Sequence, residues 1–550
     1  MADVPPLYVI SQGEKLPSGR AQEVGNKAFN LMRMAAAGLP VPPGFVLPAA
    51  WCSLPRDTDA NAEALRAALA KGIARIEGAT RLGFSSARRP LLVSVRSGAA
   101  LSMPGMMETV LDVGLNLESV DGLIRLTGNP RLAWDSFRRL IQGFAEVVAG
   151  LAVAPFDTLV CDALASVGVE NERELDYRSL RDLSQAMLRC YQDLAGEPFP
   201  AEPHTQLARA VEAVFRSWDA PKAKSFRVLK GIPGHIGTAV TVQTMVYGNA
   251  GGNSGAGVGF TRNPANGERE FYFDFRFNSQ GEDVVAGRKV LRDNTRLRAT
   301  LPEIWRQLDL ACHELELLFG DAQDFEFTVQ SGILWFLQSR HAKRTPWASV
   351  RIAVDMVEEG ICQPADALLR LAEIDLDLVE RTSFALPAPT PLANAQVASI
   401  GVACGAIALD SAAAKRMAAV GQPVILVRQE TSTADIDGLA VAEGVVTATG
   451  GRTSHAAVVA RQLGKVCLVS CPGLKVDEVG RAVQIGDRVL AEGEFLSIDG
   501  NDGTIYLGRL VVVTERPERE LAVIKTWQAA AKPGCIDRGS AKRTRQAANR

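Results

Sequence analysis

The sequence predicts a protein of mixed α/β and α+β class with several domains, and three observations support this prediction. Residues 130–218 carry apolar side chains at helical i, i+3, i+4 spacing in three successive runs. Beyond this block, residues 237–247 and 324–340 alternate apolar and polar side chains, which is the pattern of strands. Residues 398–508 consist of short strand-like runs with few long helices, which predicts a separate compact α/β module. A length of 550 residues suffices for about three domains.

The overall composition is that of an ordinary globular protein, and it argues against several classes of partner and site. Apolar residues make up 47% of the chain, charged residues 22%, and the net charge is −2. We therefore expect no nucleic acid and no anionic membrane as partner. The first residues lack a signal-peptide pattern, and no run approaches the roughly 20 apolar residues of a membrane span, so we expect a cytoplasmic protein. Nine cysteines without a C-x-x-C pair and five histidines without metal-binding spacing argue against a disulfide framework or a zinc site.

Two segments of the N-terminal part suit an anionic ligand. The run VGNKAFN places Lys27 after a glycine turn at the start of a predicted helix; a solvated lysine is the alternative. The apolar strand over residues 90–95 leads into Arg96 and then into a loop of small residues and methionines that contains Gly105 and Met107. An arginine beside accessible backbone N–H groups suits a phosphate. A surface loop whose methionines cover a core is the alternative.

The middle of the chain is expected to be helical and then to return to strands. We expect a helical insertion over about residues 120–235, followed by the strand over residues 237–247. The glycine-rich run over residues 248–257 is compatible with a flexible lid over phosphates or with a plain hairpin loop. A turn is expected at Asn266-Gly267.

The most informative local pattern is the pair of alternating strands over residues 324–340. Strand periodicity places Asp324 and Glu326 on one face, and Gln338 and Arg340 on one face of the partner strand. Two adjacent carboxylates either repel each other or share a cation, and hard oxygen ligands suit Mg²⁺. A solvated strand face is the alternative, because Phe325 and Phe327 point to the opposite side.

The C-terminal part begins with a connector over residues 346–392, which we expect to be helical and to end in the proline-rich hinge Ala385–Pro391. The compact α/β module follows over residues 393–510. Within it, GGRTSHAAVVAR places His455 at a helix start, where unpaired N–H groups favour an anion; an ordinary surface or core histidine is the alternative. Residues 511–550 are expected to be a basic, disordered tail.

Taken in order, several runs closely resemble the pyruvate phosphate dikinase family, from about residue 7 to residue 510. They are SVRSGAALSMPGMMET, NPRLAWDSFRRLIQGF, AVEAVFRSW, GTAVTVQTMVYGN, FTRNPANGE, NSQGEDVVAG, DFEFTVQSG, LQSR and GGRTSHAAVVARQLGK. The resemblance implies an ATP-grasp domain over residues 1–345 that uses ATP and Mg²⁺ to phosphorylate a histidine. It also implies a small swivelling phosphohistidine domain over residues 393–510. In the family a (β/α)₈ barrel then transfers the group to pyruvate, so that ATP, phosphate and pyruvate give AMP, pyrophosphate and phosphoenolpyruvate.

The resemblance also implies roles for individual residues. Those that match the family's triphosphate-binding, phosphate-loop and nucleotide-site positions are Lys27, Arg96, Gly105, Met107, Gln338 and Arg340. Asp324 and Glu326 match its metal ligands, and His455 matches the phosphorylated histidine. Asp274 stands where we align a family glutamate, which puts a metal or ribose contact there in doubt. Thr453 matches the threonine that regulators of the family modify, and a phosphate on it would repel the incoming polyphosphate.

The largest departure from the family is the ending, because the family continues into its barrel beyond residue 508 and this sequence ends at Arg550. We therefore expect the acceptor step to be lacking in this chain. Three hypotheses follow: a phosphotransferase that passes the group from His455 to another polypeptide, the complete dikinase reaction with a separate barrel protein, and a non-catalytic ATP-binding or regulatory protein. Phosphate as a co-substrate and a homodimer are both compatible with the sequence.

Overall fold

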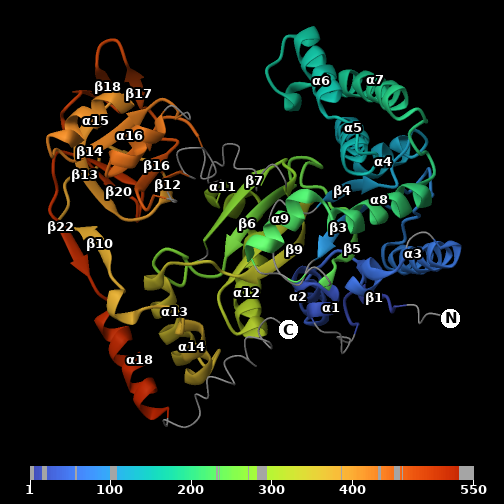
Figure 1. The fold of residues 1–550 in the computed structure, drawn as a ribbon, viewed down its shortest axis with the longest axis horizontal. Helices are drawn as coiled ribbons and strands as arrows, with labels where there is room; N and C mark the ends of the chain where they lie inside the picture. Colours follow the sequence, from blue (N-terminus) through green and yellow to red (C-terminus); the bar gives the residue numbers. More distant parts are fainter. Residues whose placement is uncertain are drawn as a thin grey trace.

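The computed structural model describes residues 5–14, 21–55, 58–98, 108–230, 233, 236–270, 272–281, 294–385, 387–431, 435–450, 459–460 and 463–531. Helices and sheets of both α/β and α+β type occur in it, which confirms the predicted class. Figure 1 shows the first two sheets in the middle of the molecule, a block of helices on one side and the C-terminal sheet as a separate body on the other.

The first sheet is antiparallel and has the strand order β1-β2-β5-β3-β4. Its strands alternate their side chains between two cores: Phe45 packs with the helical block on one face, and Val46 packs with α1 and α2 on the other. The strands are β1 (Tyr8–Ile10), β2 (Gly44–Leu47), β3 (Val93–Gly98), β4 (Thr109–Val113) and β5 (Ala239–Thr244). The short helices beside them are α1 (Ala21–Val24), α2 (Asn26–Ala36) and η1 (Ala49–Ser53).

The helical block packs on the first sheet and is expected from the i, i+3, i+4 pattern of the sequence. Helix α5 begins at Pro130 behind Asn129, whose side chain accepts a hydrogen bond from Leu132 N–H and caps the helix. Its buried side includes Phe137 and Phe144, which lie in the core shared with the sheet. The helices are α3 (Asp59–Thr80), α4 (Val120–Thr127), α5 (Pro130–Val147), α6 (Ala154–Val167), η2 (Glu172–Glu174), α7 (Tyr177–Ala195), α8 (Pro203–Ser217) and α9 (Pro221–Lys230).

The second sheet is also antiparallel, with the order β7-β6-β8-β9, and one of its faces is built from phenylalanines. Gly255, Gly257 and Gly259 alternate along β6 on that face, and a Cβ at any of them would clash with a phenylalanine ring of β7 or β8. Glycine is therefore needed for ring packing in this strand. The strands are β6 (Gly255–Phe260), β7 (Tyr272–Phe277), β8 (Gln323–Gln330) and β9 (Ile333–His341), and the helices beside them are α11 (Asn294–Thr300) and α12 (Pro302–Phe319).

The connector is a small helical unit with a core of its own. It includes α13 (Pro346–Glu358), α14 (Pro364–Leu371) and η4 (Leu376–Leu378), followed by β10 (Arg381–Phe384). The expected disordered tail from residue 511 is wrong for its first twenty residues. Strand β22 (Val512–Glu515) pairs with β10, and helix α18 (Glu518–Ala530) buries Leu521 and Ile524 against α13 and α14. These apolar residues were too few for a helix to be predicted without their partners. The basic residues from 532 onward lie outside the described residues.

The C-terminal sheet has the order β11-β21-β20-β13-β14-β15-β16-β12, with β13 to β16 parallel in its middle. Helices α15 and α16 cover one face, and the small sheet β17-β18-β19 covers the other. The strands of the large sheet are β11 (Ala393–Asn394), β12 (Gln396–Ser399), β13 (Val402–Ala408), β14 (Val424–Arg428), β15 (Gly444–Thr447), β16 (Val466–Val469), β20 (Phe495–Asp499) and β21 (Thr504–Leu507). The remaining elements are α15 (Ser411–Ala419), α16 (Ile436–Val441), β17 (Lys475–Asp477), β18 (Ala482–Ile485) and β19 (Arg488–Ala491).

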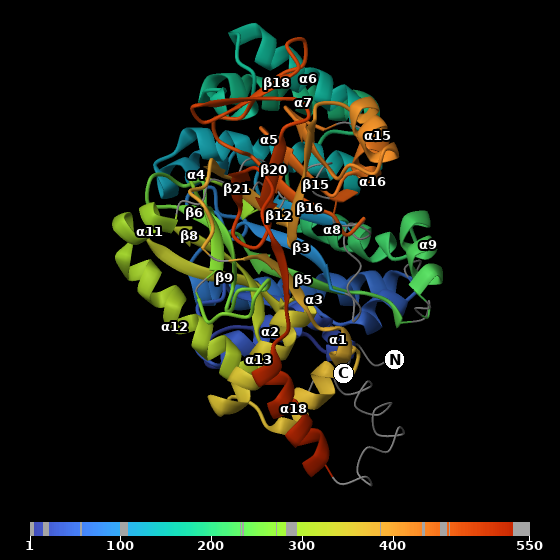
Figure 2. The ribbon, with the colours of Figure 1, turned by 90° about the vertical axis from the view of Figure 1, so that its left-hand side faces the viewer.

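We call residues 393–510 the carrier unit, after the role that the sequence leads us to expect of them, and the paired strands β10 and β22 the ribbon. Figures 1 and 2 both place α18 beside α13, at the end of the ribbon away from the carrier unit. The chain therefore enters the carrier unit along β10 and leaves it along β22. Among the described helices, none combines the length and the apolar character that a membrane span needs.

Candidate functional site

A cavity of about 440 Å³ lies between the first and second sheets. Its lining includes the charged residues Lys27, Arg96 and Glu326 together with polar and apolar side chains. The residues that line it are Lys27, Ser94, Arg96, Thr109, Leu111, Gln243, Thr244, Met245, Val246, Gln280, Gly281, Glu326, Thr328 and Leu337. Three charged residues predicted from separate stretches of the sequence are thus brought to one cavity.

Lys27 reaches the cavity because helix α2 begins directly against the end of β3. The residue before the helix, Gly25, has φ +80°, and a Cβ on it would clash with the backbone of Gly98. Only glycine combines this left-handed backbone with so close an approach. The contact fixes the first turn of α2 beside the strand that carries Arg96.

Arg96 comes directly after the predicted strand over residues 90–95 and before the predicted loop, and the structure includes it in β3, which continues to Gly98. Its backbone is opposite Thr241 of β5 and Thr109 of β4, and its side chain is half-buried. Because strands on both sides hold this backbone, the guanidinium starts from a rigid position at the wall of the cavity.

The positive charges in the cavity act on one another. The pKa of Lys27 is lowered from 10.5 to about 8, chiefly by burial; the charges of Arg96 and Arg340 also lower it, while Glu326 opposes them. Lys27 therefore sits among two like charges and one opposite charge. An anion that binds there would relieve the repulsion and return the ammonium to its charged form.

The predicted hairpin over residues 324–340 is confirmed. Its turn is formed by Ser331 and Gly332, both with positive φ, as a two-residue hairpin turn of type I′ requires. Asp324 lies opposite Arg340, and Glu326 lies opposite Gln338. The four predicted side chains of β8 and β9 therefore occupy two adjacent rows on one face of the sheet.

Asp324 is the more buried of the two carboxylates. Arg340 Nε donates a hydrogen bond of 2.7 Å to Asp324 Oδ2. Burial raises the pKa of Asp324, and the charge of Glu326 adds to this effect, whereas Arg340 opposes it. The two carboxylates therefore repel each other, and a cation bound between them would be favourable.

Asp274 belongs to the same row as Glu326. It lies on β7 opposite Val258 of β6, and Val258 is opposite Glu326 in turn. Asp274 is buried, at 7% exposure. The doubtful position of the sequence analysis thus falls on the same face as both carboxylates, two strands away from them; its role stays a prediction.

The apolar part of the cavity was missed by the sequence analysis. Leu337 faces the cavity beside Gln338 because the pairing of β8 and β9 shifts by one residue between Glu326 and Phe327. Met245 and Val246, which follow β5, supply further apolar lining together with Leu111. Neither a local irregularity in a strand nor a wall assembled from three segments has a clear signature in sequence.

The N–H groups around Val246 differ in their hydrogen bonding. Met245 N–H donates to Leu92 O, Tyr247 N–H to the Gln330 side chain and Gly248 N–H to the Gln280 side chain. Among the described residues, no partner is found for Val246 N–H. One backbone donor at the apolar wall is therefore available to a ligand.

The residues present fit a Mg²⁺ ion that arrives with a phosphate ligand. The described residues contain no group of three or more His, Cys, Asp or Glu side chains that could hold a metal alone. Mg²⁺ is usually bound by one or two carboxylates and completes its shell with water and phosphate oxygens. Asp324 and Glu326, adjacent on one face beside a cationic cavity, match this donor set.

Several predicted residues cannot be placed. Gly105, Met107, Thr453 and His455 lie outside the described residues. The glycine-rich run over residues 248–257 is partly strand, since β6 begins at Gly255, and its glycines there pack against rings of the core. Those strand glycines give no support to a lid, whereas residues 248–254 do form a connection between two strands.

Two models of protein families match the chain. One, described as the AMP/ATP-binding domain of pyruvate phosphate dikinase, matches residues 62–307. The other, described as the mobile domain of PEP-utilising enzymes, matches residues 420–503. The first range covers Arg96 and most of the lining of the cavity, and the second covers the segment that contains His455.

Curated relatives match nearly the whole chain. Pyruvate, phosphate dikinase of Clostridium symbiosum is 42% identical over 491 residues, which are 88% of this chain and 56% of the relative. Pyruvate, phosphate dikinase 2 of Oryza sativa subsp. japonica is 41% identical, over 92% of this chain and 57% of the relative. Pyruvate, phosphate dikinase of Rhizobium meliloti (strain 1021) is 38% identical, over 96% of this chain and 60% of the relative. The chain thus spans little more than half the length of these relatives.

Proposed function

Because this chain belongs to the pyruvate phosphate dikinase family, we propose that it is an ATP- and Mg²⁺-dependent phosphotransferase that phosphorylates its own His455. The observation that carries the proposal is the cavity between two antiparallel sheets, into which Lys27, Arg96 and Glu326 converge. A nucleotide held between two sheets is the arrangement of an ATP-grasp domain, and we assign the first half of the chain to that fold. The cytoplasmic location expected from the sequence stays part of this proposal.

The charged residues in and beside the cavity suit the polyphosphate. Lys27 and Arg96 would neutralise the phosphate oxygens, and Arg340 would exchange its bond to Asp324 for one to phosphate. Asp324 and Glu326 would hold Mg²⁺, which supplies charge neutralisation to the phosphates when bound. Gln338, opposite Glu326, would contact the nucleotide from the same face.

The apolar residues of the lining suit the base. Met245, Val246, Leu111 and Leu337 line it, and Val246 N–H is directed to no protein acceptor among the described residues. A purine needs flat apolar contacts and one or two backbone hydrogen bonds at its edge. The cavity thus has a place for each part of ATP.

The transfer itself needs mainly positioning and charge neutralisation. A neutral ring nitrogen of His455 attacks phosphorus, the bond from phosphorus to the bridging oxygen breaks, and the remaining polyphosphate or nucleotide leaves. Gly105 and Met107 would belong to the loop over the phosphates. Thr453, two residues before His455, would be the regulatory position.

The proposal is tested with ATP labelled at the β- or the γ-phosphate in the presence of Mg²⁺. We expect acid-labile, base-stable label on the protein, because phosphohistidine has that stability, and none on a His455→Ala variant. The two labels distinguish which phosphate is transferred. Equal labelling of His455→Ala would overturn the assignment of the acceptor.

An Arg96→Met variant distinguishes a loss of nucleotide binding from a loss of folding. We expect it to lose labelling while its unfolding transition stays close to that of the wild type, because Arg96 is half-buried at the cavity and both neighbouring strands remain paired through their backbones. A Lys222→Met variant, which removes a surface ion pair with Glu108, is the matched control and should label normally.

The acceptor of the phosphoryl group is a separate part of the proposal. The relatives are named for pyruvate and phosphate, so we propose pyruvate, bound by a barrel domain on this or another chain, as the acceptor, with phosphate as co-substrate. Formation of phosphoenolpyruvate when a barrel domain is added would support it. Label that reaches His455 but never pyruvate would leave the first step standing and refute this second one.

A further inference from the structure

The residue after the apolar wall of the cavity, Tyr247, makes a buried hydrogen bond across the first sheet. Its hydroxyl donates to Asp112 Oδ1 at 2.9 Å. Both side chains are nearly inaccessible, at 5% exposure for Tyr247 and 3% for Asp112. Burial raises the pKa of Tyr247 well above 10, and the charge of Asp112 and the hydrogen bond add to the shift. The phenol therefore remains a neutral donor throughout the physiological range.

Asp112 is directed inward by an irregularity of β4. The pairing of β3 with β4 shifts between Val93 and Val95, and Asp112 itself has φ +58°. Aspartate and asparagine tolerate this left-handed backbone better than most residues. A shift of this kind re-aims a side chain, and here Asp112 and Val113 are both buried, although they are neighbours in a strand.

Tyr247 also contacts the second sheet through its backbone. Its N–H donates to Gln330 Oε1 at the end of β8, 2.8 Å away. The next residue, Gly248, donates its N–H to Gln280, which lines the cavity. Tyr247 is thus bound by its hydroxyl to the first sheet and by its backbone N–H to the second.

We propose that Tyr247 is a positioning residue for nucleotide recognition, which holds the wall formed by Met245 and Val246 in place through its hydrogen bond to Asp112. This inference rests on the proposed function, because it assumes that the wall receives the base of ATP. Tyr247 does not line the cavity, so it acts through its neighbours and not by contact with the ligand. The Tyr247 hydroxyl bonds to β4, whereas the residues proposed for the polyphosphate come from α2, β3, β8 and β9.

The experiment compares two probes, ATP and inorganic tripolyphosphate, by calorimetry on the full chain with Mg²⁺. Tyr247→Phe removes only the hydroxyl and leaves the buried carboxylate of Asp112 one donor short. We expect ATP to bind about tenfold more weakly, because the wall is no longer held, and tripolyphosphate to bind within about twofold of the wild type. The ratio of the two affinities is the readout, since a general loosening would lower both.

Two further variants separate positioning from stability. Asp112→Asn keeps an oxygen acceptor and tolerates the same backbone, so ATP should bind within about twofold of the wild type. In the double variant Tyr247→Phe/Asp112→Asn the buried charge is gone, so thermal stability should recover relative to Tyr247→Phe while the affinity for ATP stays low. This pattern is not expected from a purely structural pair.

The outcomes are distinct. A Tyr247→Phe protein that binds ATP as the wild type does, or that loses ATP and tripolyphosphate to the same extent, would overturn the inference. Recovery of ATP affinity in the double variant would also overturn it, because the effect would then come from the buried charge alone. A wild-type protein that binds neither probe would instead refute the proposed function.

Discussion

The charge of the Lys27 side chain depends on what the cavity contains. Its pKa of about 8 means that a substantial fraction of the free protein is uncharged there at pH 8. Polyphosphate favours the ammonium, so ATP binding at pH 8 should draw in about half a proton. Calorimetry in buffers of different ionisation enthalpy measures this uptake. Affinity for ATP should therefore fall as the pH rises above 8, and Lys27→Met should abolish the uptake.

The lowered pKa of Lys27 also makes the stability of the ligand-free protein depend on pH. Between pH 8 and 10.5 the unfolded chain holds a proton on Lys27 that the folded chain has released. The contribution of this group to the free energy of unfolding therefore rises with pH across that window, and its penalty is fully present below pH 8. If Lys27→Met took up as many protons on binding ATP as the wild type does, a group other than Lys27 would be the source of the uptake.

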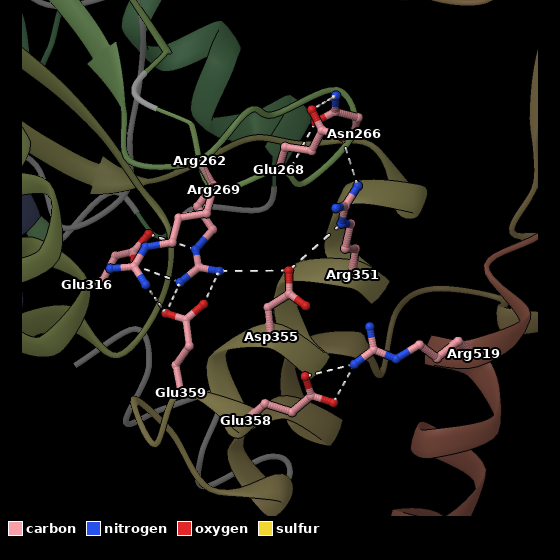
Figure 3. A network of polar contacts seen from close by, with 10 residues as sticks. All are labelled: Arg262, Asn266, Glu268, Arg269, Glu316, Arg351, Asp355, Glu358, Glu359 and Arg519. Carbon is pink, nitrogen blue, oxygen red and sulfur yellow. Dashed lines mark hydrogen bonds and ion pairs between the residues drawn. The ribbon is translucent and has the colours of Figure 1, made fainter.

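Arg262 forms, with Glu316, the most buried ion pair in the described part of the chain. Figure 3 shows its guanidinium between Glu316 of α12 and Glu359, which follows α13. Burial acts to lower the pKa of Arg262, but the hydrogen bonds to Glu316 and Glu359 outweigh it and raise the pKa. Arg262→Leu would strand the carboxylate of Glu316 in the interior, so we expect a loss of about 3–5 kcal/mol in the free energy of unfolding.

Arg519 offers the matched control for this loss. It also makes two hydrogen bonds to one carboxylate, that of Glu358, but its side chain is 66% exposed (Figure 3). Arg519→Leu should cost less than about 1 kcal/mol, because exposed pairs are screened by water. Urea unfolding measures both variants. Equal urea midpoints for the two variants would contradict the expectation that the buried ion pair contributes more to stability than the exposed one.

The start of α2 makes a sharp prediction about an element. Gly25→Ala adds a methyl group that clashes with the backbone of Gly98, so the first turn of α2 must move and carry Lys27 away from Arg96. We expect ATP affinity to fall by about tenfold or more, since misplacement of a charged group by about 1 Å can have such an effect. Binding of ATP by calorimetry tests this.

Gly38, just beyond the C-terminal end of the same helix, is the control for backbone strain. It also has positive φ, at +89°, but nothing lies within 4 Å of a Cβ there. Gly38→Ala therefore carries the conformational cost of about 1–3 kcal/mol without the clash, and its ATP affinity should match the wild type. If both variants lose ATP equally, strain and not the Gly98 contact explains the effect.

How much of these elements the sequence predicted depends on how local their causes are. The hairpin of β8 and β9 was predicted with its turn and its face, because alternation and the Ser331-Gly332 pair lie within seventeen residues. The contact of Gly25 with Gly98 and the bond of Tyr247 to Asp112 were not, because each joins distant segments and either residue alone is ordinary. Helix α18 was missed for the same reason: its core partners are α13 and α14.

The contacts of the ribbon bear on how the carrier unit would move. Toward the carrier unit, the Phe384 ring packs edge-on against Tyr506, and Asn501 donates to Thr382 O. Within the carrier unit, its last residue Leu510 donates its N–H to the buried Ser497, which fixes the chain just before β22. Toward the connector, the Arg381 guanidinium stacks 4.3 Å from the centre of the Trp347 ring. Because Arg262, just after β6, pairs with Asp355 of α13 and with Glu359 at its end, we expect the connector to stay with the first half of the chain.

This arrangement favours a pivot at the connector end of the ribbon, at residues 379–380 and 516–517, over the proline-rich run that the sequence suggested. Trp347→Ala removes the stack that holds Arg381, so the carrier unit should sample a wider range of positions. Spin labels at Val420 and Leu117, exposed by 80% and 54%, would report this as a broader distribution of distances. Replacing Pro387, Pro389 and Pro391 together by alanine should leave the distribution unchanged, because the ribbon stays attached to the carrier unit on both strands. Broadening by the proline variant but not by Trp347→Ala would return the pivot to the proline-rich run.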